Sequence, residues 1–371
     1  MGVTTVFCML SFNTFLTYSV KIISQEPSPR FRHQPLECQK ESVISCKYVS
    51  LDTAAPKWAD EITLPNNSTM KIKSRTESSA IYKDSLMEAY FSWNKGAMVV
   101  KISQPGRVWT IHGCGDAGCF LMIEHYPHKQ YEGDGVELPS GLKQRSKIPT
   151  NGVELPSRLI QAPTIEDSGT KTTISNIVYY TTKFKNSFPN EEEMNAFIDL
   201  VFLETNQGYE NSDIPIILVL HCKVELITDT DYESMQPSNA LITFTDTQSR
   251  KSADTASLWT AYFDMTHSQS CAAGWVDVAR WCPAAYVVVD KNCAELGYEF
   301  GHELGHNLGN RHNVEQYTNG QLDDHEYRYG HGFLIPEDPS VTNPSYPQND
   351  GYHTIMGYQR NYYYKALLEQ P

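Results

Sequence analysis

Positive charge is scarce in this sequence. Its 371 residues include 30 Lys and Arg against 44 Asp and Glu, which gives a formal net charge of −14. Nucleic-acid-binding proteins usually present a basic face, so this deficit argues against a nucleic-acid partner. Hydrophobic residues still make up 40% of the chain, which supplies a real core and excludes collagen-like and fully disordered chains. The length favours two domains, with three as the alternative.

Apolar runs long enough to cross a membrane are missing after the first two dozen residues. The segment Val3–Val20 is mostly apolar and uncharged, although Asn13 interrupts it and no basic segment precedes it. A secretory signal peptide over residues 1–24 explains this composition better than an uncleaved anchor or a buried segment. We therefore expect a secreted, extracellular protein with no stable membrane insertion.

The cysteine count agrees with export. One of the nine cysteines, Cys8, would leave with the signal peptide, and the other eight are divided equally between the two halves of the chain. An even number in an exported chain indicates disulfides, although spacing alone leaves their pairing open. The eight are Cys38, Cys46, Cys114, Cys119, Cys222, Cys271, Cys282 and Cys293.

Charge and a short duplication divide the chain into two parts. Residues 1–164 carry 18 Lys and Arg with 15 Asp and Glu, whereas residues 165–371 carry 12 and 29. Between them, the sequence Gly-Val-Glu-Leu-Pro-Ser occurs at residues 135–140 and again at 152–157. Two copies are too few for a solenoid, so we interpret residues 135–165 as an exposed basic linker suited to proteolytic processing. The linker separates a domain over residues 25–134 from one over residues 166–371.

The hydrophobic patterns differ between these two parts. Ala97–Ile102 and Cys119–Ile123 are typical of strands, which predicts a small β-rich module in the first part. The second part predicts a helix over Glu191–Gly208, with Gly208 ending it, and a further helix over Cys293–Leu308. Its predicted strands are Ser175–Tyr180, Ile214–Val224, Leu241–Thr245, Leu258–Phe263 and Ala284–Asp290. This alternation predicts an α/β domain.

One segment of the last predicted helix is spaced for a catalytic zinc site. His302 and His306 lie one turn apart on the same helical face and can hold one Zn²⁺ ion. Gly309 can adopt a positive φ, which would end the helix and bring His312 to the same ion. Three protein ligands leave a fourth position for water, the pattern of catalytic zinc. Glu303, beside that face, is placed to take a proton from the water.

This segment resembles the metzincin metallopeptidase signature, H-E-x-x-H-x-x-G-x-x-H followed by a Met-turn. His302–His312 matches the first element, and Tyr352–Tyr358, which contains Met356, matches the second. Further similarity to the reprolysin-like (adamalysin-like) group occurs in Glu204–Ser212, Asp290–Ala294 and Tyr327–Phe333. Asn313 departs from the adamalysin pattern, which normally has Asp after the third His. The resemblance implies a metzincin catalytic domain with a mixed twisted sheet, an active-site helix and Met356 as a hydrophobic floor under the metal.

The function implied by the resemblance is that of a secreted zinc-dependent metalloendopeptidase acting on protein or peptide substrates. One Zn²⁺ would activate water and polarise the scissile carbonyl, with Glu303 as general base. A structural Ca²⁺ is compatible with the sequence, but nothing in it indicates one. One alternative is a catalytically silent metzincin that acts as an extracellular binding protein. Another is a gluzincin site with Glu326 as the third ligand.

The resemblance also assigns expectations outside the zinc motif. Tyr358, two residues after Met356, is a candidate zinc ligand or oxyanion stabiliser, with simple packing as the alternative. The N-terminal part is expected to be a propeptide that holds the enzyme latent. Cys114 is its candidate cysteine switch, with a disulfide as the alternative. Substrate is expected along a cleft-edge strand between Trp275 and Tyr286.

Overall fold

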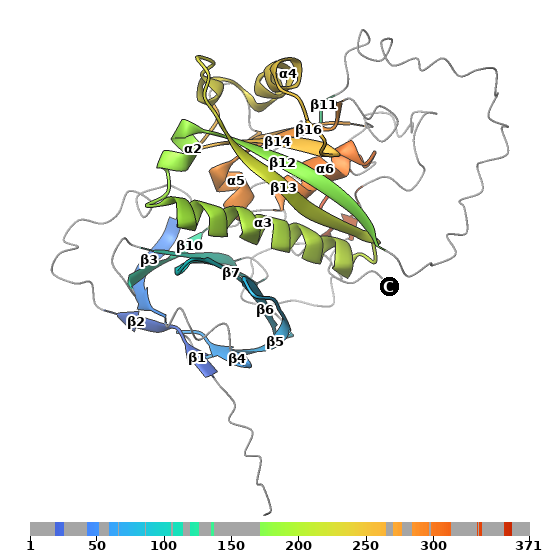
Figure 1. The fold of residues 1–371 in the computed structure, drawn as a ribbon. Coiled ribbons are helices and arrows are strands. Elements are labelled where there is room, and N and C mark those ends of the chain that lie inside the picture. The colour runs from blue at the N-terminus through green and yellow to red at the C-terminus, as the bar shows by residue number, and fades with distance from the viewer. Residues whose placement is uncertain are drawn as a thin grey trace, which may run out of the picture.

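The computed structural model describes most of residues 43–125 and 171–312, together with a few short segments. The described ranges are 19–25, 43–51, 59–65, 67–85, 87–104, 107–113, 119–125, 135–136, 171–264, 270–276, 284–296, 298–312, 332, 334–335 and 352–357. Figure 1 shows a curled sheet from the N-terminal part lying against an α/β unit, with one long helix between them. We call residues 19–125 the N-terminal unit and residues 171–357 the C-terminal unit.

The N-terminal unit is a ten-stranded sheet that curls on itself (Figure 1). Its strands are β1 (Ser19–Lys21), β2 (Ile23–Gln25), β3 (Val43–Ser50), β4 (Glu61–Thr63), β5 (Thr69–Arg75), β6 (Ser79–Lys83), β7 (Glu88–Asn94), β8 (Ala97–Gln104), β9 (Arg107–Gly113) and β10 (Cys119–His125). In the sheet they follow the order β1-β4-β5-β6-β7-β8-β9-β10-β3-β2. The expected β-rich module is therefore present, and both strands predicted in it, β8 and β10, are observed.

The two ends of this sheet are joined by one short segment. β1 pairs with β4 at one end and β2 pairs with β3 at the other, and only the buried Ile22 separates β1 from β2. The segment 19–25 thus closes the sheet, which removes its exposed edges. The predicted signal-peptide boundary at residue 24 falls within this closing segment.

Five strands of the C-terminal unit and β11 from the preceding linker form a mixed six-stranded sheet, as predicted. Its order is β11-β15-β16-β14-β12-β13, with β11 (Gly135–Val136), β12 (Thr172–Thr181), β13 (Ile216–Leu226), β14 (Thr255–Thr260), β15 (Ala272–Trp275) and β16 (Tyr286–Asp290). β12, β13, β14 and β16 run parallel, and β15 runs antiparallel to β16. Every residue of β14 and β16 is buried, as expected for central parallel strands covered on both faces.

Helices cover both faces of this sheet. One face packs against α3 (Glu191–Asn211), α5 (Lys291–Leu296) and α6 (Glu299–Asn307), and the other against α4 (Pro237–Thr247). The shorter α2 (Thr182–Asn186) follows β12, and a 3₁₀ turn covers Tyr232–Ser234. The side chain of Asn190 caps α3 by accepting a hydrogen bond of 2.8 Å from the Glu193 amide, and three glutamates in its first turn favour the helix dipole.

Three sequence predictions about helices and strands are wrong. Leu241–Thr245 lies in α4 rather than in a strand, because Ala240, Leu241 and Phe244 form a buried helical stripe after Pro237 at the helix start. α3 continues past Gly208 to Asn211. A Cβ atom at Gly208 would lie 3.2 Å from Ile355 Cδ1, so this glycine makes room for a neighbour.

The helix predicted over Cys293–Leu308 is divided into α5 and α6. Tyr298, with φ −96° and ψ 25°, is the N-cap of α6 and lies between the two helices. A disulfide between Cys271 and Cys293 attaches α5 to the start of β15, and the described Cys222 in β13 is a free thiol. A two-stranded sheet of β17 (Leu334–Ile335) and β18 (Tyr352–His353) completes the described elements. Within the described part of the chain, no helix has the length and apolar character needed to cross a membrane.

Candidate metal centre

The end of α6 brings three histidines together. Gly309 has a φ of 94°, its amide donates to the His306 carbonyl at 3.0 Å, and the Asn310 amide donates to the Gly305 carbonyl at 2.9 Å. These two bonds form the Schellman motif, in which a left-handed glycine ends the helix and reverses the chain. The reversal places His312 beside the two histidines of the helix, as the sequence predicted for Gly309.

The three imidazoles form a tight triangle of Nε2 atoms. The Nε2 atom of His302 lies 3.1 Å from that of His306 and 3.2 Å from that of His312, and the remaining distance is 3.0 Å. All three side chains are buried. A tetrahedral zinc ion with Zn–N bonds of about 2.0–2.1 Å holds its nitrogens about 3.3 Å apart. The donor set and its spacing therefore fit one such ion.

Hydrogen bonds on the outer nitrogens fix two of the rings. His302 Nδ1 lies 2.7 Å from the Ile355 carbonyl oxygen, and His306 Nδ1 lies 2.8 Å from that of Asn310. A carbonyl oxygen can only accept, so both Nδ1 atoms carry the proton and donate. The neutral rings then direct their Nε2 lone pairs to the centre of the triangle. This arrangement is the usual second layer around a metal-binding histidine.

Glu303 lies beside the triangle and packs against β15. Its side chain is fully buried. A Cβ atom at Gly274 would lie 2.7 Å from the Glu303 carbonyl oxygen and 2.9 Å from its Oε2 atom. Only glycine at position 274 lets the strand approach the glutamate this closely.

The turn containing Met356 lies directly against α6. A Cβ atom at Gly305 would lie 2.5 Å from Met356 Sδ, and Gly332 lies against the Met356 backbone. The Gly357 amide closes the turn by donating to the Thr354 carbonyl at 2.8 Å. The same turn supplies the Ile355 carbonyl that accepts from His302. Met356 thus packs on the helical face that carries the histidines.

Asn307 anchors the helix to the sheet. Its Nδ2 atom donates to the Trp275 carbonyl at 2.9 Å and to the Tyr286 carbonyl at 3.2 Å. These residues end β15 and begin β16, so the amide fixes α6 against both strands. The second group of potential metal ligands, Cys271, Asp290 and Cys293, does not offer two free thiolates, because its cysteines form the disulfide.

The strand next to Glu303 is paired with a segment from the linker. β11 lies parallel to β15, with Gly135 opposite Gly274 and Val136 opposite Trp275. Because Gly274 packs against Glu303, the backbone of this segment lies one strand away from the glutamate. β15 is therefore covered on the edge that faces away from β16.

Several predicted residues lie outside the described part of the chain. These are Tyr358, Cys114, Glu326, Asn313 and most of the stretch between Trp275 and Tyr286. Sequence reasoning also missed Gly274 and Asn307, which position the helix. Asn307 lies within the His302–His312 motif, and no other feature of the sequence indicated its role. Gly274 has no local signal, because its role depends on a residue 29 positions away.

A family model matches the C-terminal part of the chain. The model of metallopeptidase family M12, Reprolysin_5, matches residues 170–366, more than half of the chain. No curated protein matches. Among solved structures, a chain in a chaperone–substrate complex is 14% identical with a TM-score of 0.36, over 82% of this chain and 38% of its own length. Metalloproteinase-II from Bacteroides fragilis is 11% identical with a TM-score of 0.41, over 68% of this chain and 80% of its own. Neither structural likeness carries a functional argument.

Proposed function

Because the chain belongs to metallopeptidase family M12, we propose that it is a zinc-dependent endopeptidase that hydrolyses protein or peptide substrates outside the cell. The observation that supports this most strongly is the buried triangle of Nε2 atoms, 3.0–3.2 Å apart. Peptidases of this family depend on a metal ion, and His302, His306 and His312 are the residues that would hold it. Zinc bound there would supply a Lewis acid that polarises the scissile carbonyl and makes water more acidic.

Glu303 is the proposed general base. Its carboxylate would accept the proton of the attacking water and pass it to the leaving amine. Burial and the contact with Gly274 hold the carboxylate in place. Tyr358 remains the proposed oxyanion-stabilising residue or further ligand, and Met356 the floor beneath the ligands. His302, His306, His312 and Glu303 are all present, which argues against the alternative of a silent binding protein.

We also propose that the chain is made as a latent precursor. The pairing of β11 with β15 supports this, because β11 occupies the sheet edge next to Glu303. An extended substrate that adds to this edge through main-chain hydrogen bonds would have to displace β11. Cleavage within the linker of residues 135–165 would free the segment. We propose separately that Cys114 acts as a cysteine switch that contributes to this latency.

The test compares peptidase activity before and after cleavage of the linker in the full-length chain. We expect a fluorogenic peptide to be cleaved only after the linker is cut, and a chelator to abolish the activity. The Glu303→Gln variant should keep its zinc and lose about 10²–10⁴-fold in kcat. Undiminished proteolysis by that variant would exclude Glu303 as the base.

A further inference from the structure

We propose that the N-terminal unit stays bound to the C-terminal unit as a permanent non-covalent partner after the linker has been cut. A propeptide is usually thought of as a removable cover. Here the interface lies on α3 and α5, whereas the edge strand beside Glu303 is β15. The contacts that hold the N-terminal unit therefore do not involve that edge, so cutting the linker leaves them intact. This inference rests on packing and does not depend on the proposed peptidase activity.

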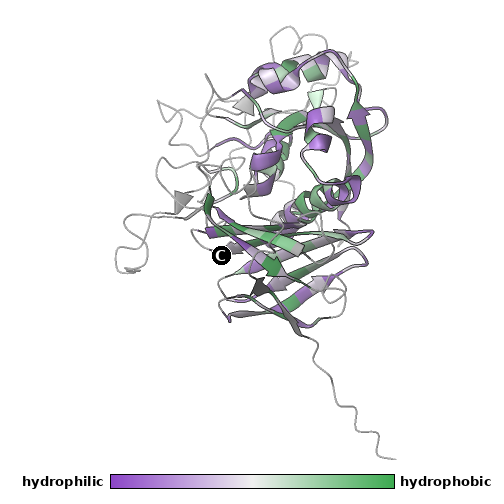
Figure 2. Cartoon of the chain, turned by 90° about the vertical axis from the view of Figure 1, so that its left-hand side faces the viewer, coloured by the Kyte–Doolittle hydropathy of each residue, from purple (hydrophilic) through white to green (hydrophobic). Residues whose placement is uncertain are grey.

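The first observation is that α3 is buried around most of its circumference. It packs against β13 of its own unit on one side and against β7 and β8 of the N-terminal unit on the other. Figure 2 shows the N-terminal strands directly beneath this helix, with hydrophobic residues on both. A helix that is apolar on several faces is stable only when it is covered on all of them. The buried residues of α3 are Glu193, Met194, Ala196, Phe197, Ile198, Leu200, Val201, Phe202, Glu204, Thr205, Gln207, Gly208 and Tyr209.

The second observation is that one apolar cluster crosses the boundary between the units. Ile81, Tyr90 and Val99 come from the N-terminal unit, and they belong to the same buried cluster as Phe197 and Leu200 of α3. That cluster continues to the C-terminal sheet. Removal of the N-terminal unit would expose the far side of the core that supports α6.

The third observation is a fully buried ion pair across the boundary. Lys101 Nζ of β8 lies 2.6 Å from Glu204 Oε1 of α3, and the two side chains are 2% and 3% exposed. The same ammonium group lies 5.1 Å from the centre of the Tyr298 ring. Burial raises the pKa of Glu204 to about 7, against the opposing effect of Lys101. Without the lysine, the buried Glu204 would have to stay charged without its cation or take up a proton, and either is costly.

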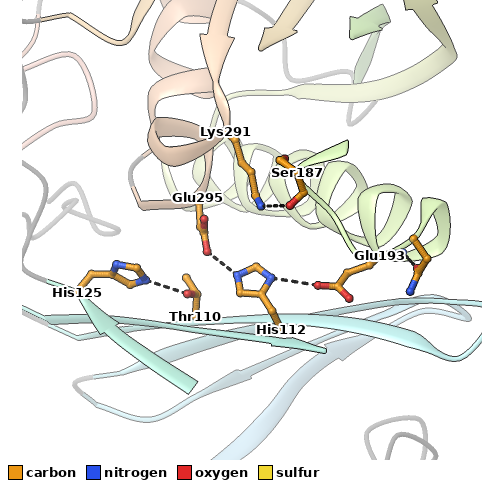
Figure 3. A network of polar contacts seen from close by, with 8 residues as sticks. Thr110, His112, His125, Ser187, Glu193, Lys291 and Glu295 are labelled. Atoms are coloured by element: carbon orange, nitrogen blue, oxygen red, sulfur yellow. Dashed lines mark hydrogen bonds and ion pairs between the residues drawn. The ribbon is translucent and has the colours of Figure 1, made fainter. Parts of the chain in front are cut away.

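A second charged site crosses the same boundary (Figure 3). His112 of β9 lies between two carboxylates, with Nε2 at 2.5 Å from Glu295 Oε1 and Nδ1 at 3.6 Å from Glu193 Oε1. Burial lowers the pKa of His112, but the charge of Glu295 and hydrogen bonds to both glutamates raise it overall, to about 9. The ring is therefore cationic at neutral pH. A Cβ atom at the next residue, Gly113, would lie 2.9 Å from Glu193 Oε2, so the backbones also fit closely.

The interface thus combines a shared apolar core with charge complementarity. The N-terminal unit contributes two cations, Lys101 and His112, and the C-terminal unit contributes three buried carboxylates. Removing one partner from a buried charge pair is strongly destabilising. We therefore expect the C-terminal unit to keep the N-terminal unit bound rather than to release it.

The experiment uses the full-length chain with residues 144–150 replaced by the recognition sequence of a site-specific protease. After complete cleavage at neutral pH, we expect both fragments to co-elute at 1:1 stoichiometry in size-exclusion chromatography. A denaturing, non-reducing gel should then separate them. Separate elution of two folded fragments would overturn the proposal, as would a disulfide link between the fragments on that gel.

Variants of the ion pair test the interface itself. In the cleaved protein, Lys101→Met should weaken the association of the fragments by about 100-fold or more, because it leaves Glu204 buried without its cation. Adding Glu204→Met removes both charges and should restore most of the affinity. Lys185→Met is the matched control, because Lys185 pairs with Glu225 at 2.8 Å within the C-terminal unit. Unchanged association in Lys101→Met, or no recovery in the double variant, would contradict the proposed role.

Discussion

The buried histidine triangle and the partly buried His112 differ in what faces each ring. At the candidate metal centre, the inner nitrogens of three rings face one another, and two outer nitrogens donate to backbone carbonyls. At the boundary between the units, both nitrogens of His112 face carboxylates. The first arrangement suits neutral rings with converging lone pairs, and the second suits a protonated ring. Burial alone therefore does not distinguish a metal ligand from an ion-pair partner, whereas the groups around each nitrogen do.

The largest effect is expected at the metal centre. Replacing His312 with Ala should remove zinc and reduce peptidase activity to background, because two histidines alone do not complete the site. Glu326→Ala serves as the matched control and should keep both zinc and activity. Retained zinc in the His312→Ala protein, with loss in Glu326→Ala, would favour the gluzincin arrangement instead.

The next effect is expected at the boundary between the units. Lys101→Met should destabilise the intact chain by about 3–5 kcal/mol, since it leaves a buried carboxylate without its cation. Lys185→Met removes a more exposed pair that solvent screens, so its cost should be much smaller. Urea denaturation of both variants measures the difference. Equal losses of unfolding free energy in the two variants would contradict the larger contribution that we assign to the buried pair.

A pH titration separates His112 from the histidine triangle further. The pKa of His112 is raised from 6.5 to about 9 in the folded protein, so its contribution is present in full below about pH 6.5 and is lost as the pH rises through 9. The size is on the order of 3 kcal/mol. Glu295 acts in the opposite direction: although burial favours its protonated form, His112 and Lys291 lower its pKa well below the usual value. Its contribution is present above its unfolded pKa and is lost in strong acid. In the His112→Gln variant, the free energy of unfolding should therefore fall less as the pH rises through 9.

The smallest effect concerns packing under the metal centre. Gly305→Ala would place a Cβ atom 2.5 Å from Met356 Sδ, and overpacking of this kind costs about 1–3 kcal/mol. The Met356 side chain is flexible, which favours the lower part of this range. Thermal unfolding measures the change. Gly96→Ala is the control without a steric clash, because nothing lies within 4 Å of its Cβ position. Its φ of 98° adds backbone strain to the effect of this substitution.

The sequence predicted those features that depend on neighbours close along the chain. The i and i+4 spacing of His302 and His306, with a left-handed Gly309, correctly predicted that His312 would join them. The continuous apolar runs predicted β12, β13 and β16. The prediction was wrong at Leu241–Thr245, because its β-branched residues suggested a strand although Ala240, Leu241 and Phe244 have helical spacing.

Features that depend on distant contacts could not be predicted. His112 and Glu295 are separated by 183 residues, and neither has a local pattern that indicates its partner. Gly208 suggested a helix end, but its contact with Ile355 can be seen only in the folded chain. The charge difference between the two halves was visible in the sequence. The pairing of a few opposite charges at α3 and α5 was not.

Zinc content per chain tests the proposed metal centre most directly. Elemental analysis of the purified full-length protein should find one zinc per chain, and none after His306→Ala. His112→Gln, which alters the charged site at the boundary between the units, should leave the zinc content at one. Absence of zinc from the unaltered protein, or zinc that survives His306→Ala, would contradict the assignment of the three histidines as its ligands.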